Sequence, residues 1–437
     1  MSIKVGFVGM THLGLNSAVA GAERGFDMVC FDPDTTLISE LNAGTPPVQE
    51  PELTELMAKH KARIHFTADT ADLNACDVVY VAPDVATDDQ GNSDLTTLEA
   101  RLATAFESTG HDTAIVVLSQ VPPGFSRTRQ QAGRTLIYQV ETLIFGRVIE
   151  RAMHPERYII GLENADTPLP PAYKTYLDGH GNPPLFPMAY ESAELAKIAI
   201  NCCLVSSVST ANMLAELCEK MGANWADIIP TLKADKRIGQ YSYLAPGLGI
   251  SGGNLERDLN TIIRMADLHG TDSGVVRSWV HNSQYRKDWP LRMLATYVFP
   301  YINQPTIGVL GLTYKENTHS IKNSPSVQLI KQLGDYRLQA FDPMISAEQE
   351  WHASIDNKTS AKETCKGADV LLLLTAWPEF RELDPTEIAE WMQGDTIIDP
   401  FQLLDHKQVK QAGLQHIILG TQPHLTHDVD ATNSQAA

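Results

Sequence analysis

The most constraining feature of the sequence is a strand and glycine-rich turn that occurs twice. An apolar run at Ile3–Val8 leads into a glycine turn, and the run at Thr306–Thr313 repeats that opening far along the chain. Each copy is followed by a further apolar run that ends in Phe-Asp-Pro, at residues 31–33 and 341–343. Because apolar runs alternate with helical patterns after each copy, both predict a doubly wound parallel sheet of the Rossmann-like type.

The region between the two copies has a helical pattern. Glu191–Met221 contains neither Pro nor Gly and carries apolar residues at helical spacing, and helical patterns recur at Asp258–His269 and Val275–Val298. A chain of 437 residues is also longer than a chain that ordinarily folds around a single hydrophobic core. We therefore predict an α/β protein with two Rossmann-like domains joined by a central helical domain. The N-terminal, central and C-terminal domains and a flexible tail are expected at residues 1–190, 191–300, 301–420 and 421–437.

Charge and composition exclude several classes of function. The formal charge of -19 argues against binding nucleic acid or an anionic membrane surface, because both require a basic face. No charged leader precedes the first strand, and no apolar run approaches the roughly 20 residues of a membrane helix, so we expect neither signal nor membrane segment. The six cysteines show no metal-ligand spacing and predict reduced thiols in a cytoplasmic protein without a metal.

The first glycine turn has the features of a dinucleotide site. Gly9 and Gly14 hold the outer positions of the glycine pattern, and Thr11 replaces the middle glycine. Asp32 follows the second strand, where a carboxylate binds the ribose hydroxyls of NAD and repels the 2′-phosphate of NADP. Asp34 adds to that repulsion. We therefore predict NAD as the cofactor, although a glycine turn without a ligand and a solvated aspartate at the end of a strand remain the alternatives.

Ordered motifs run along almost the whole chain. Besides the first glycine turn they are Ser-Gln-Val-Pro-Pro-Gly at 119–124, Glu-Leu-Ala-Lys-Ile-Ala-Ile-Asn at 194–201, Lys-Arg-Ile-Gly at 236–239, the glycine loop 246–253, Gly-Leu-Thr-Tyr-Lys at 311–315 and Thr-Ala-Trp-Pro-Glu-Phe at 375–380. Together these motifs resemble the UDP-glucose/GDP-mannose dehydrogenase family. The resemblance implies an NAD-binding N-terminal domain, a central dimerisation and substrate domain, and a C-terminal domain that binds the sugar nucleotide. It also implies a UDP-sugar substrate. The long apolar central helix predicts the interface of a homodimer, with internal packing of that helix as the alternative.

The family's chemistry requires a thiol that this chain lacks. Members oxidise a sugar 6-alcohol to a carboxylate in two NAD-dependent hydride transfers, and a cysteine after the glycine loop traps the intermediate aldehyde. Asn254 stands at that position, and a carboxamide is not a useful nucleophile. Cys202 and Cys203 lie elsewhere, on the central helix, where packing is the usual role of a cysteine.

Further departures lie in the motifs around the family's site. Gln120 replaces the threonine of the Ser-Thr-Val-Pro motif, and by resemblance it faces the cofactor. Glu141 matches the first acidic residue of the Pro-Glu-Phe-Leu-x-Glu stretch, but Phe145 replaces the second. Phe401 stands where the family has a substrate-binding arginine. The usual Val-Pro-Thr-Pro is Ala-Pro-Asp-Val at residues 82–85. Such scattered changes indicate a divergent branch.

Several polar residues of the family's site persist. Lys197 and Asn201 lie four residues apart, so a helix places both on one face, and by resemblance they hold a water or the developing alkoxide. Asp258 resembles the family's general-base partner. The alternatives are a lysine on a solvated helix face and a carboxylate at a helix start, which the helix dipole favours.

The substrate residues are expected in three further segments. Four glycines within residues 247–253, of which Gly249, Gly252 and Gly253 are our substrate candidates, suit close approach of backbone to a ligand. By resemblance, Arg237 reaches the substrate of a neighbouring subunit and Lys315 lies near the sugar nucleotide, although either could be surface charge. His12, in the first turn, is expected to be solvated.

The sequence thus predicts an NAD-dependent oxidoreductase of a nucleotide sugar, acting on a CH–OH group. Without the thiol, the reaction either stops after one hydride transfer or uses water. The alternative from another class is a non-catalytic paralogue that binds NAD and a nucleotide sugar. Retention of Glu141, Lys197, Asn201 and Asp258 favours the enzyme, whereas Asn254 favours the paralogue.

Overall fold

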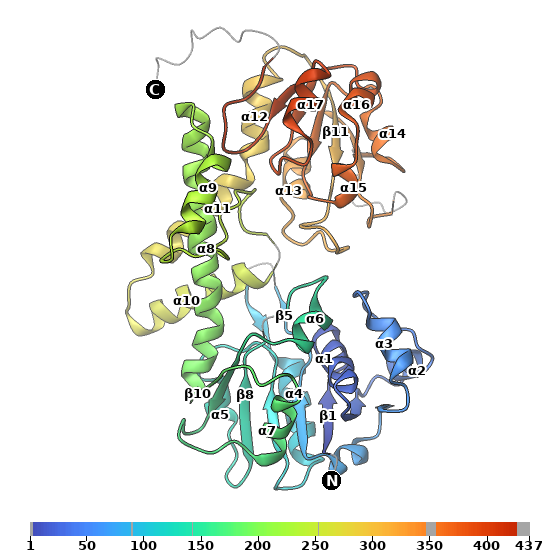
Figure 1. The fold of residues 1–437 in the computed structure, drawn as a ribbon, viewed down its shortest axis with the longest axis vertical. Coiled ribbons are helices and arrows are strands. Elements are labelled where there is room, and N and C mark those ends of the chain that lie inside the picture. Colours follow the sequence, from blue (N-terminus) through green and yellow to red (C-terminus); the bar gives the residue numbers. More distant parts are fainter. Residues whose placement is uncertain (1–2, 89–90, 142, 252, 347–354, 426–437) are drawn as a thin grey trace. The chain divides into compact units, whose positions relative to one another are not determined.

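The computed structural model describes residues 3–88, 91–141, 143–251, 253–346 and 355–425 (Figure 1). The chain divides into two compact units, Met1–Ile200 and Asn201–Ala437. Helix α8 (Tyr190–Met221) belongs to both, because the boundary falls within it. Each unit is built around one of the two predicted sheets.

The first unit contains an eight-stranded sheet in the order β10-β9-β8-β7-β4-β1-β2-β3. Its strands are β1 (Lys4–Val8), β2 (Asp27–Phe31), β3 (Ile64–Thr67), β4 (Val78–Val81), β7 (Ala114–Val117), β8 (Thr135–Gln139), β9 (Tyr158–Leu162) and β10 (Leu185–Ala189). From β3 to β8 every pair is parallel, which is the doubly wound order with its switch point between β1 and β4. Strand β9 pairs antiparallel with β8, so the sheet is not parallel throughout. A two-stranded hairpin, β5 (Ala86–Thr87) with β6 (Ser93–Asp94), follows β4.

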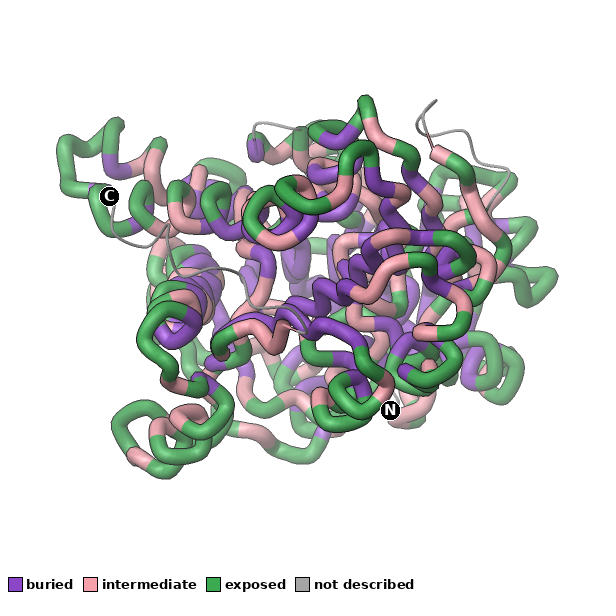
Figure 2. Tube along the Cα trace, turned by 90° about the horizontal axis from the view of Figure 1, so that it is seen from above, coloured by how far each residue is buried: buried purple, intermediate pink, exposed green. Residues whose placement is uncertain are grey.

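Helices cover both faces of this sheet, which explains why its central strands are almost wholly apolar. One face packs against α1 (His12–Glu23), α2 (Thr35–Asn42), α3 (Leu53–Lys59), α6 (Val148–Met153) and α7 (Pro171–Asp178). The other packs against the 3-10 helix η1 (Thr70–Ala75), α4 (Thr96–Glu107), α5 (Phe125–Arg129) and the start of α8. Buried segments of the chain lie toward the inside, and exposed segments follow the outer turns (Figure 2).

The second unit begins with the central helices and continues into the second sheet. The helices after α8 are α9 (Trp225–Ala234), α10 (Asn254–His269), α11 (Gly274–Lys287) and α12 (Trp289–Tyr297). The strands are β11 (Thr306–Leu310), β12 (Arg337–Phe341), β13 (Ile355–Asn357), β14 (Val370–Leu373), β15 (Thr396–Ile398) and β16 (Gln415–Ile417). Their order is β13-β12-β11-β14-β15-β16, and all pairs are parallel. The helices around this sheet are α13 (Pro325–Gln332), α14 (Ala361–Cys365), α15 (Pro378–Arg381), α16 (Pro385–Trp391) and α17 (His406–Gln411).

The strand orders confirm the predicted fold class, since both sheets follow one doubly wound plan. Two helix predictions need correction. The pattern at Val275–Val298 is broken at Asp288, and α12 starts with Trp289 and Pro290, where the missing proline N–H is tolerated. Helix α10 begins at Asn254, four residues before the predicted start, so Asp258 lies in its second turn.

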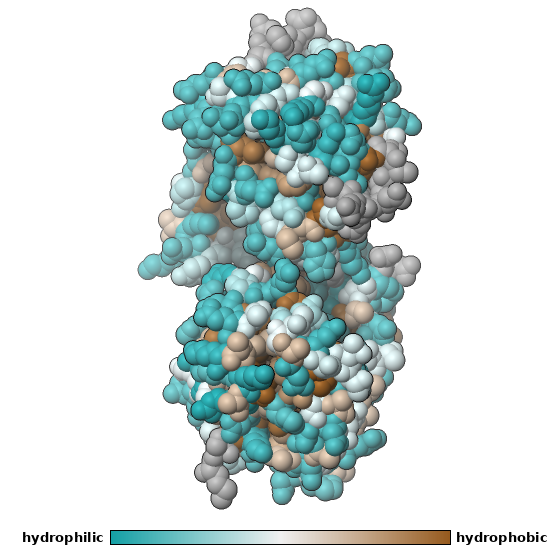
Figure 3. Space-filling view, turned by 90° about the vertical axis from the view of Figure 1, so that its right-hand side faces the viewer, coloured by the Kyte–Doolittle hydropathy of each residue, from teal (hydrophilic) through white to brown (hydrophobic). Residues whose placement is uncertain are grey.

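Helix α8 also corrects the expectation about apolar runs. By length and composition alone it is long and apolar enough to cross a membrane, with a mean hydropathy of 1.5 over its most apolar window. This is weak evidence, because core helices of soluble proteins pass the same test and 39% of that window is buried within the protein. The one face of the molecule that Figure 3 draws is mostly hydrophilic, with apolar side chains in scattered spots.

Candidate active site

The first glycine turn joins β1 to α1 at the switch point of the sheet. Gly9 has φ 99°, and a Cβ there would lie 2.9 Å from the backbone nitrogen of Pro83. A Cβ on Gly14 would lie 2.0 Å from the carbonyl oxygen of Gly9, so only glycine lets α1 pack this closely. Both positions therefore require the residue that the sequence places there. The turn has the compact form that a pyrophosphate needs.

Asp32 lies immediately after β2 and turns its carboxylate toward this turn. Its Oδ2 accepts the N–H of Met10 at 2.9 Å, and its Oδ1 accepts the N–H of Asp34 at 3.1 Å. The side chain is only 8% exposed. Because each carboxylate oxygen can accept two hydrogen bonds, Asp32 keeps acceptor capacity for ribose hydroxyls. Asp34 is occupied otherwise, since its Oδ1 caps α2 through the N–H groups of Thr36 and Leu37.

The start of α1 is bound to Asp84, which follows β4. The N–H of His12 donates to Asp84 Oδ2 at 2.9 Å, and the N–H of Asp84 donates to Thr11 Oγ1 at 2.8 Å. Thr11 is the N-cap of α1 but makes no capping bond with its side chain. A carboxylate thus occupies the first amide of the helix where a cofactor phosphate binds in this fold. The site fits a dinucleotide once the exposed Asp84 side chain turns away from that amide.

His12 is not solvated, contrary to the expectation from sequence. Its Nε2 lies 2.8 Å from Glu50 Oε1, and the two side chains are only 13% and 2% exposed. Its ring stacks on Phe145, with centroids 4.3 Å apart. Both oxygens of Glu50 also accept the N–H of Gly146. Glu50 therefore brings a buried carboxylate beside position 145, where the family's second acidic residue is replaced by Phe145, and the sequence offers no local signal for this.

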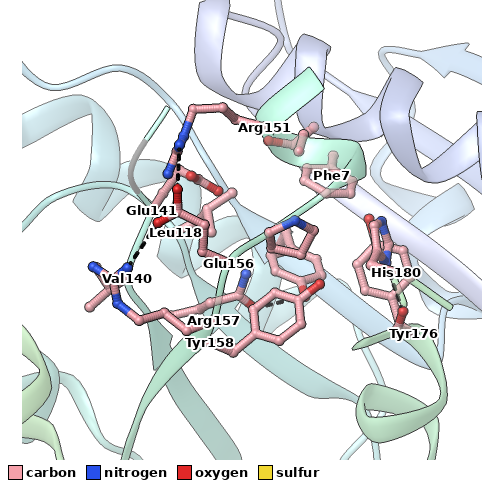
Figure 4. Close-up of a pocket in the computed structure, with 15 residues that line it drawn as sticks. Phe7, Leu118, Val140, Glu141, Arg151, Glu156, Arg157, Tyr158, Tyr176 and His180 are labelled. Carbon is pink, nitrogen blue, oxygen red and sulfur yellow. Dashed lines mark hydrogen bonds and ion pairs between the residues drawn. The ribbon is translucent and has the colours of Figure 1, made fainter. Parts of the chain in front are cut away.

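Glu141 lines a small cavity of the first unit (Figure 4). Charged side chains, Arg151 and Glu156 among them, gather on one side of it, and the rings of Phe7, Tyr176 and His180 lie on the other. Arg151 is paired with Glu156 at 3.1 Å. The cavity volume is about 50 Å³, enough for a few waters but not for a nucleotide sugar. The structure therefore places Glu141 in a small cavity lined by both polar and apolar side chains.

Gln120 and Lys197 are half-buried in the first unit. Gln120 follows β7 directly after Ser119, whose hydroxyl donates to the carbonyl oxygen of Pro83 at 2.5 Å. This bond holds the loop after β7 against the loop that leads from β4 to Asp84. Lys197 lies on α8, one turn after Glu194. Glu194 is fully buried and accepts the N–H groups of Gly124 and Ser126 at 2.6 and 2.8 Å, so it anchors the start of α5.

In the second unit, Asn201 and Asp258 form a direct pair. The side-chain amide of Asn201 donates to Asp258 Oδ2 at 2.5 Å, and the two residues are 8% and 1% exposed. Arg257 places its Nε 3.5 Å from Asp258 Oδ1 and is also buried. Asp258 is therefore not a solvated carboxylate at a helix start. The fold has gathered an amide, a carboxylate and a guanidinium between α8 and α10.

Asn254, which by resemblance corresponds to the family's cysteine, is the first residue of helix α10. It is exposed, and Gly253 is the N-cap of the helix. Two residues further on, Glu256 accepts from Lys287 Nζ at 2.8 Å and from the side-chain amide of Asn323. Lys287 is 4% exposed on its side chain. This network ties the first turn of α10 to Lys287 and Asn323 through Glu256.

The glycine loop before α10 is held against two other elements of its unit. Gly249 has φ 80°, and a Cβ there would lie 2.4 Å from the carbonyl oxygen of Ser283. Ser251 Oγ donates to the carbonyl oxygen of Tyr314 at 3.4 Å, next to half-buried Lys315. A Cβ on Gly253 would meet no atom within 4 Å, and Gly252 lies outside the described residues. The loop and the Lys315 segment are thus neighbours.

Two further positions from the sequence analysis, Arg237 and Phe401, make contacts within their own unit. The Arg237 side chain is 88% exposed and pairs with Asp235 two residues earlier, with Nε 3.0 Å from Oδ1. Phe401 packs into the apolar clusters on both faces of the second sheet. A phenyl ring in this place offers no hydrogen bond to a phosphate or sugar. Either the substrate contacts differ from the family's or other residues make them.

The cysteines near Asn201 are poor substitutes for the missing nucleophile. Burial, and then the charge of Asp258, raise the pKa of the Cys202 thiol to about 11. At neutral pH it is almost wholly protonated, and the thiol form is not the nucleophile. Cys203 is exposed on α8 rather than placed on the loop before α10. All six cysteines are unpaired, and the described residues contain no cluster of three or more metal-ligating side chains.

Comparison with known proteins covers all three parts of the chain. The NAD binding domain, the central domain and the UDP binding domain of the UDP-glucose/GDP-mannose dehydrogenase family match residues 3–173, 191–284 and 308–406. A UDP-glucose 6-dehydrogenase of Rhizobium meliloti is 30% identical over 96% of this chain and 99% of its own length. One from Rickettsia conorii is 28% identical over 96% of this chain and 100% of its own.

Solved structures show the same fold. The structure of a UDP-glucose dehydrogenase from Pyrobaculum islandicum superposes with a TM-score of 0.82 at 23% identity, covering 96% of this chain and 98% of that one. The glycine turn, the two doubly wound sheets and the ordered domain matches agree with one another. The chain therefore belongs to the UDP-glucose/GDP-mannose dehydrogenase family of NAD-dependent nucleotide-sugar oxidoreductases.

Proposed function

We propose that the protein oxidises a hydroxyl-bearing carbon of a UDP-sugar with NAD, and does so without a covalent aldehyde intermediate. The observation that carries this proposal is the buried Asn201–Asp258 pair, retained at 2.5 Å although the thiol position is Asn254. The UDP binding domain that matches residues 308–406 supports the nucleotide, and the names of the relatives support glucose as the first sugar to try.

The cofactor is held by the first glycine turn. Gly9, Thr11 and Gly14 shape the backbone around the pyrophosphate, and Asp32 accepts the hydroxyls of the adenosine ribose. Gln120 faces the nicotinamide end, where its amide can donate or accept a hydrogen bond. NAD, when bound, accepts a hydride from the alcohol carbon. These roles follow from the strand ends on which the residues lie.

Three residues handle the oxygen and the proton of the alcohol. Lys197 and Asn201 lie four residues apart on α8 and stabilise the alkoxide that develops as the hydride leaves. Asp258 orients Asn201 through the bond at its Oδ2 and receives the released proton through a bound water. Arg257 lies beside Asp258, with Nε 3.5 Å from Oδ1, and balances the charge of the buried carboxylate.

Asn254 decides how far the oxidation goes. A carboxamide nitrogen does not attack an aldehyde, so no tetrahedral adduct with the protein forms. An aldehyde has no second hydride to give until a nucleophile adds to it. The reaction therefore stops after one hydride transfer, unless water adds to the aldehyde and the hydrate is oxidised. The glycine loop, with Gly249, Gly252 and Gly253, would hold the sugar, and Lys315 would contact the sugar nucleotide. Arg237 would reach the substrate of the neighbouring subunit.

The test is the number of NADH molecules formed per sugar nucleotide consumed, across UDP-, GDP- and other activated sugars. One NADH per sugar, with an aldehyde or ketone as product, supports a single oxidation. Two NADH supports oxidation of the hydrate. No NADH from any of these sugars, with NAD still bound, would establish the alternative of a non-catalytic binding paralogue.

We further propose a cytoplasmic homodimer that uses α8 as its seam. Met213, Leu217 and Met221 follow one another at four-residue spacing and are 56%, 50% and 70% exposed. An exposed apolar stripe of this kind is typical of a surface that pairs with another chain. The unpaired cysteines support a reducing compartment. The domain boundaries at residues 190, 300 and 420 are also part of the proposal.

A further inference from the structure

An arginine that no motif singles out lies beside the ribose carboxylate of the cofactor site. Arg101 is on α4, in the middle of the helix, and its Nη2 lies 3.9 Å from Asp32 Oδ1. The arginine side chain is 21% exposed and Asp32 is 8% exposed. Helix α4 is far from Asp32 in sequence, so the doubly wound sheet alone brings the two charges together.

The guanidinium of Arg101 has unused hydrogen-bonding capacity. Its Nε is buried and has no hydrogen-bond partner among the described residues. The distance of 3.9 Å to Asp32 is an ion pair but too long for a hydrogen bond. The buried Nε is out of reach of a ligand, but the Arg101 side chain is 21% exposed, so the terminal N–H groups of its guanidinium can donate to an acceptor that a ligand supplies.

Asp32 does not need Arg101 to hold its position. The N–H groups of Met10 and Asp34 already fix both of its oxygens. A purely structural arginine would be expected to bond the carboxylate directly, with the forked geometry that guanidinium and carboxylate share. Arg101 instead stands off from Asp32 and leaves N–H donors beside it. The space next to this pair is where the adenosine ribose lies, given the ribose placement proposed above.

We propose that Arg101 is a cofactor-specificity residue that donates to the adenosine ribose of NAD beside Asp32. Ribose hydroxyl oxygens accept hydrogen bonds, and Asp32 accepts the hydrogens of the same hydroxyls, so one ribose satisfies both residues. The positive charge also offsets the repulsion between Asp32 and a 2′-phosphate. The protein therefore binds NADP measurably but prefers NAD. Asp32 increases this preference for NAD over NADP, and Arg101 reduces it.

The experiment measures the Kd of NADH and of NADPH by their fluorescence, in the full-length protein without substrate. Arg101→Met should weaken NADH binding about fivefold and NADPH binding about fiftyfold. The effect on NADPH is larger because its 2′-phosphate also loses the positive charge that Arg101 supplies beside Asp32. The NADPH-to-NADH ratio of Kd values thus rises about tenfold. Arg101→Lys should keep the NADPH-to-NADH ratio of Kd values close to that of the wild type, since lysine retains the positive charge although it lacks the forked geometry of the guanidinium. Asp32→Asn should move the ratio in the opposite direction.

Arg129→Met is the matched control. Arg129 also pairs with an acidic residue of α4, Glu99, but its side chain is 41% exposed and the pair lies apart from Asp32. It should leave both Kd values unchanged, and thermal unfolding should confirm that every variant is folded. If Arg101→Met leaves both Kd values unchanged while Asp32→Asn alters the ratio, the inference about Arg101 is wrong. If neither variant changes the ratio, the ribose is not at Asp32 and the cofactor placement itself is wrong.

Discussion

At the scale of single residues, the proposed function depends on Asn254, which by resemblance stands at the position of the family's cysteine. Asn254 is exposed at the first position of α10, and the turn that carries it is fixed by Glu256 through Lys287 and Asn323. The scaffold that would present a nucleophile is therefore intact. The nearest alternative thiol, Cys202, has a pKa raised to about 11 and is not a nucleophile at neutral pH.

Because Asn254 lies at the first position of α10, the variant Asn254→Cys tests the proposed role of this position directly. We expect the variant to form a covalent adduct with the aldehyde product and to raise the yield toward two NADH per sugar, because the thiolate supplies the tetrahedral adduct that Asn254 cannot. Intact-mass spectrometry of the quenched reaction checks the adduct. Cys202→Ala should leave NADH formation unchanged. A variant that gains neither adduct nor second hydride would mean that the substrate does not present its alcohol to this loop.

At the scale of elements, the start of α1 shows how a loop tunes an anion site. Amides at a helix N-terminus attract anions, and here the His12 amide is bound by the carboxylate of Asp84. The hydroxyl of Thr11, at the position of the usual middle glycine, holds the Asp84 backbone in place. Two departures from the family's motifs thus act together, and the cofactor phosphates compete with a side chain of the protein.

Removal of that carboxylate should therefore strengthen cofactor binding. We expect Asp84→Asn to lower the Kd of NADH by about fivefold, because a neutral amide neither repels the pyrophosphate nor competes strongly for the His12 amide. Titration by NADH fluorescence measures this change. Asp166→Asn, at an exposed aspartate of the same unit, is the control and should change nothing. Weaker binding in Asp84→Asn would instead identify Asp84 as a ligand of the cofactor.

At the scale of the whole molecule, α8 connects the two units and leaves an apolar stripe exposed. Its buried face contributes Ala211, Ala215 and Cys218 to a cluster with Trp225 of α9, whereas Met213, Leu217 and Met221 are uncovered. A stripe that is buried in a dimer removes apolar surface from water, which is the main driving force for association.

Leu217→Glu tests the seam. A charge in the middle of the stripe should convert the dimer to a monomer, because an unpaired carboxylate in an apolar interface is strongly unfavourable. Light scattering coupled to size exclusion measures the mass. Lys233→Glu, an acidic substitution on the exposed face of α9, should leave the mass unchanged. A wild-type protein that already runs as a monomer would contradict the proposed dimer, and circular dichroism checks that both variants remain helical.

The sequence predicted the sheets well because their signals are local. Apolar runs buried on both faces, a glycine turn and Phe-Asp-Pro after the second strand recur in both domains, and the observed strand orders repeat accordingly. Helix ends were predicted less well, since the break at Asp288 depends on where Trp289 packs rather than on the helical pattern alone. The cofactor residues Gly9, Gly14 and Asp32 come together as their motif implies.

The sequence by itself thus determined the fold class and the two copies of the plan, because both follow from patterns in neighbouring residues. The assignment of Asn254 to the cysteine position stays a prediction from sequence. Only the tertiary structure decided which distant side chains meet: Arg101 with Asp32, Asp84 with the start of α1, Glu50 with His12, and Asn201 with Asp258. A charge pair across a sheet leaves no periodicity in the chain. Its partners are chosen by the packing of whole elements, and that packing is a property of the folded protein.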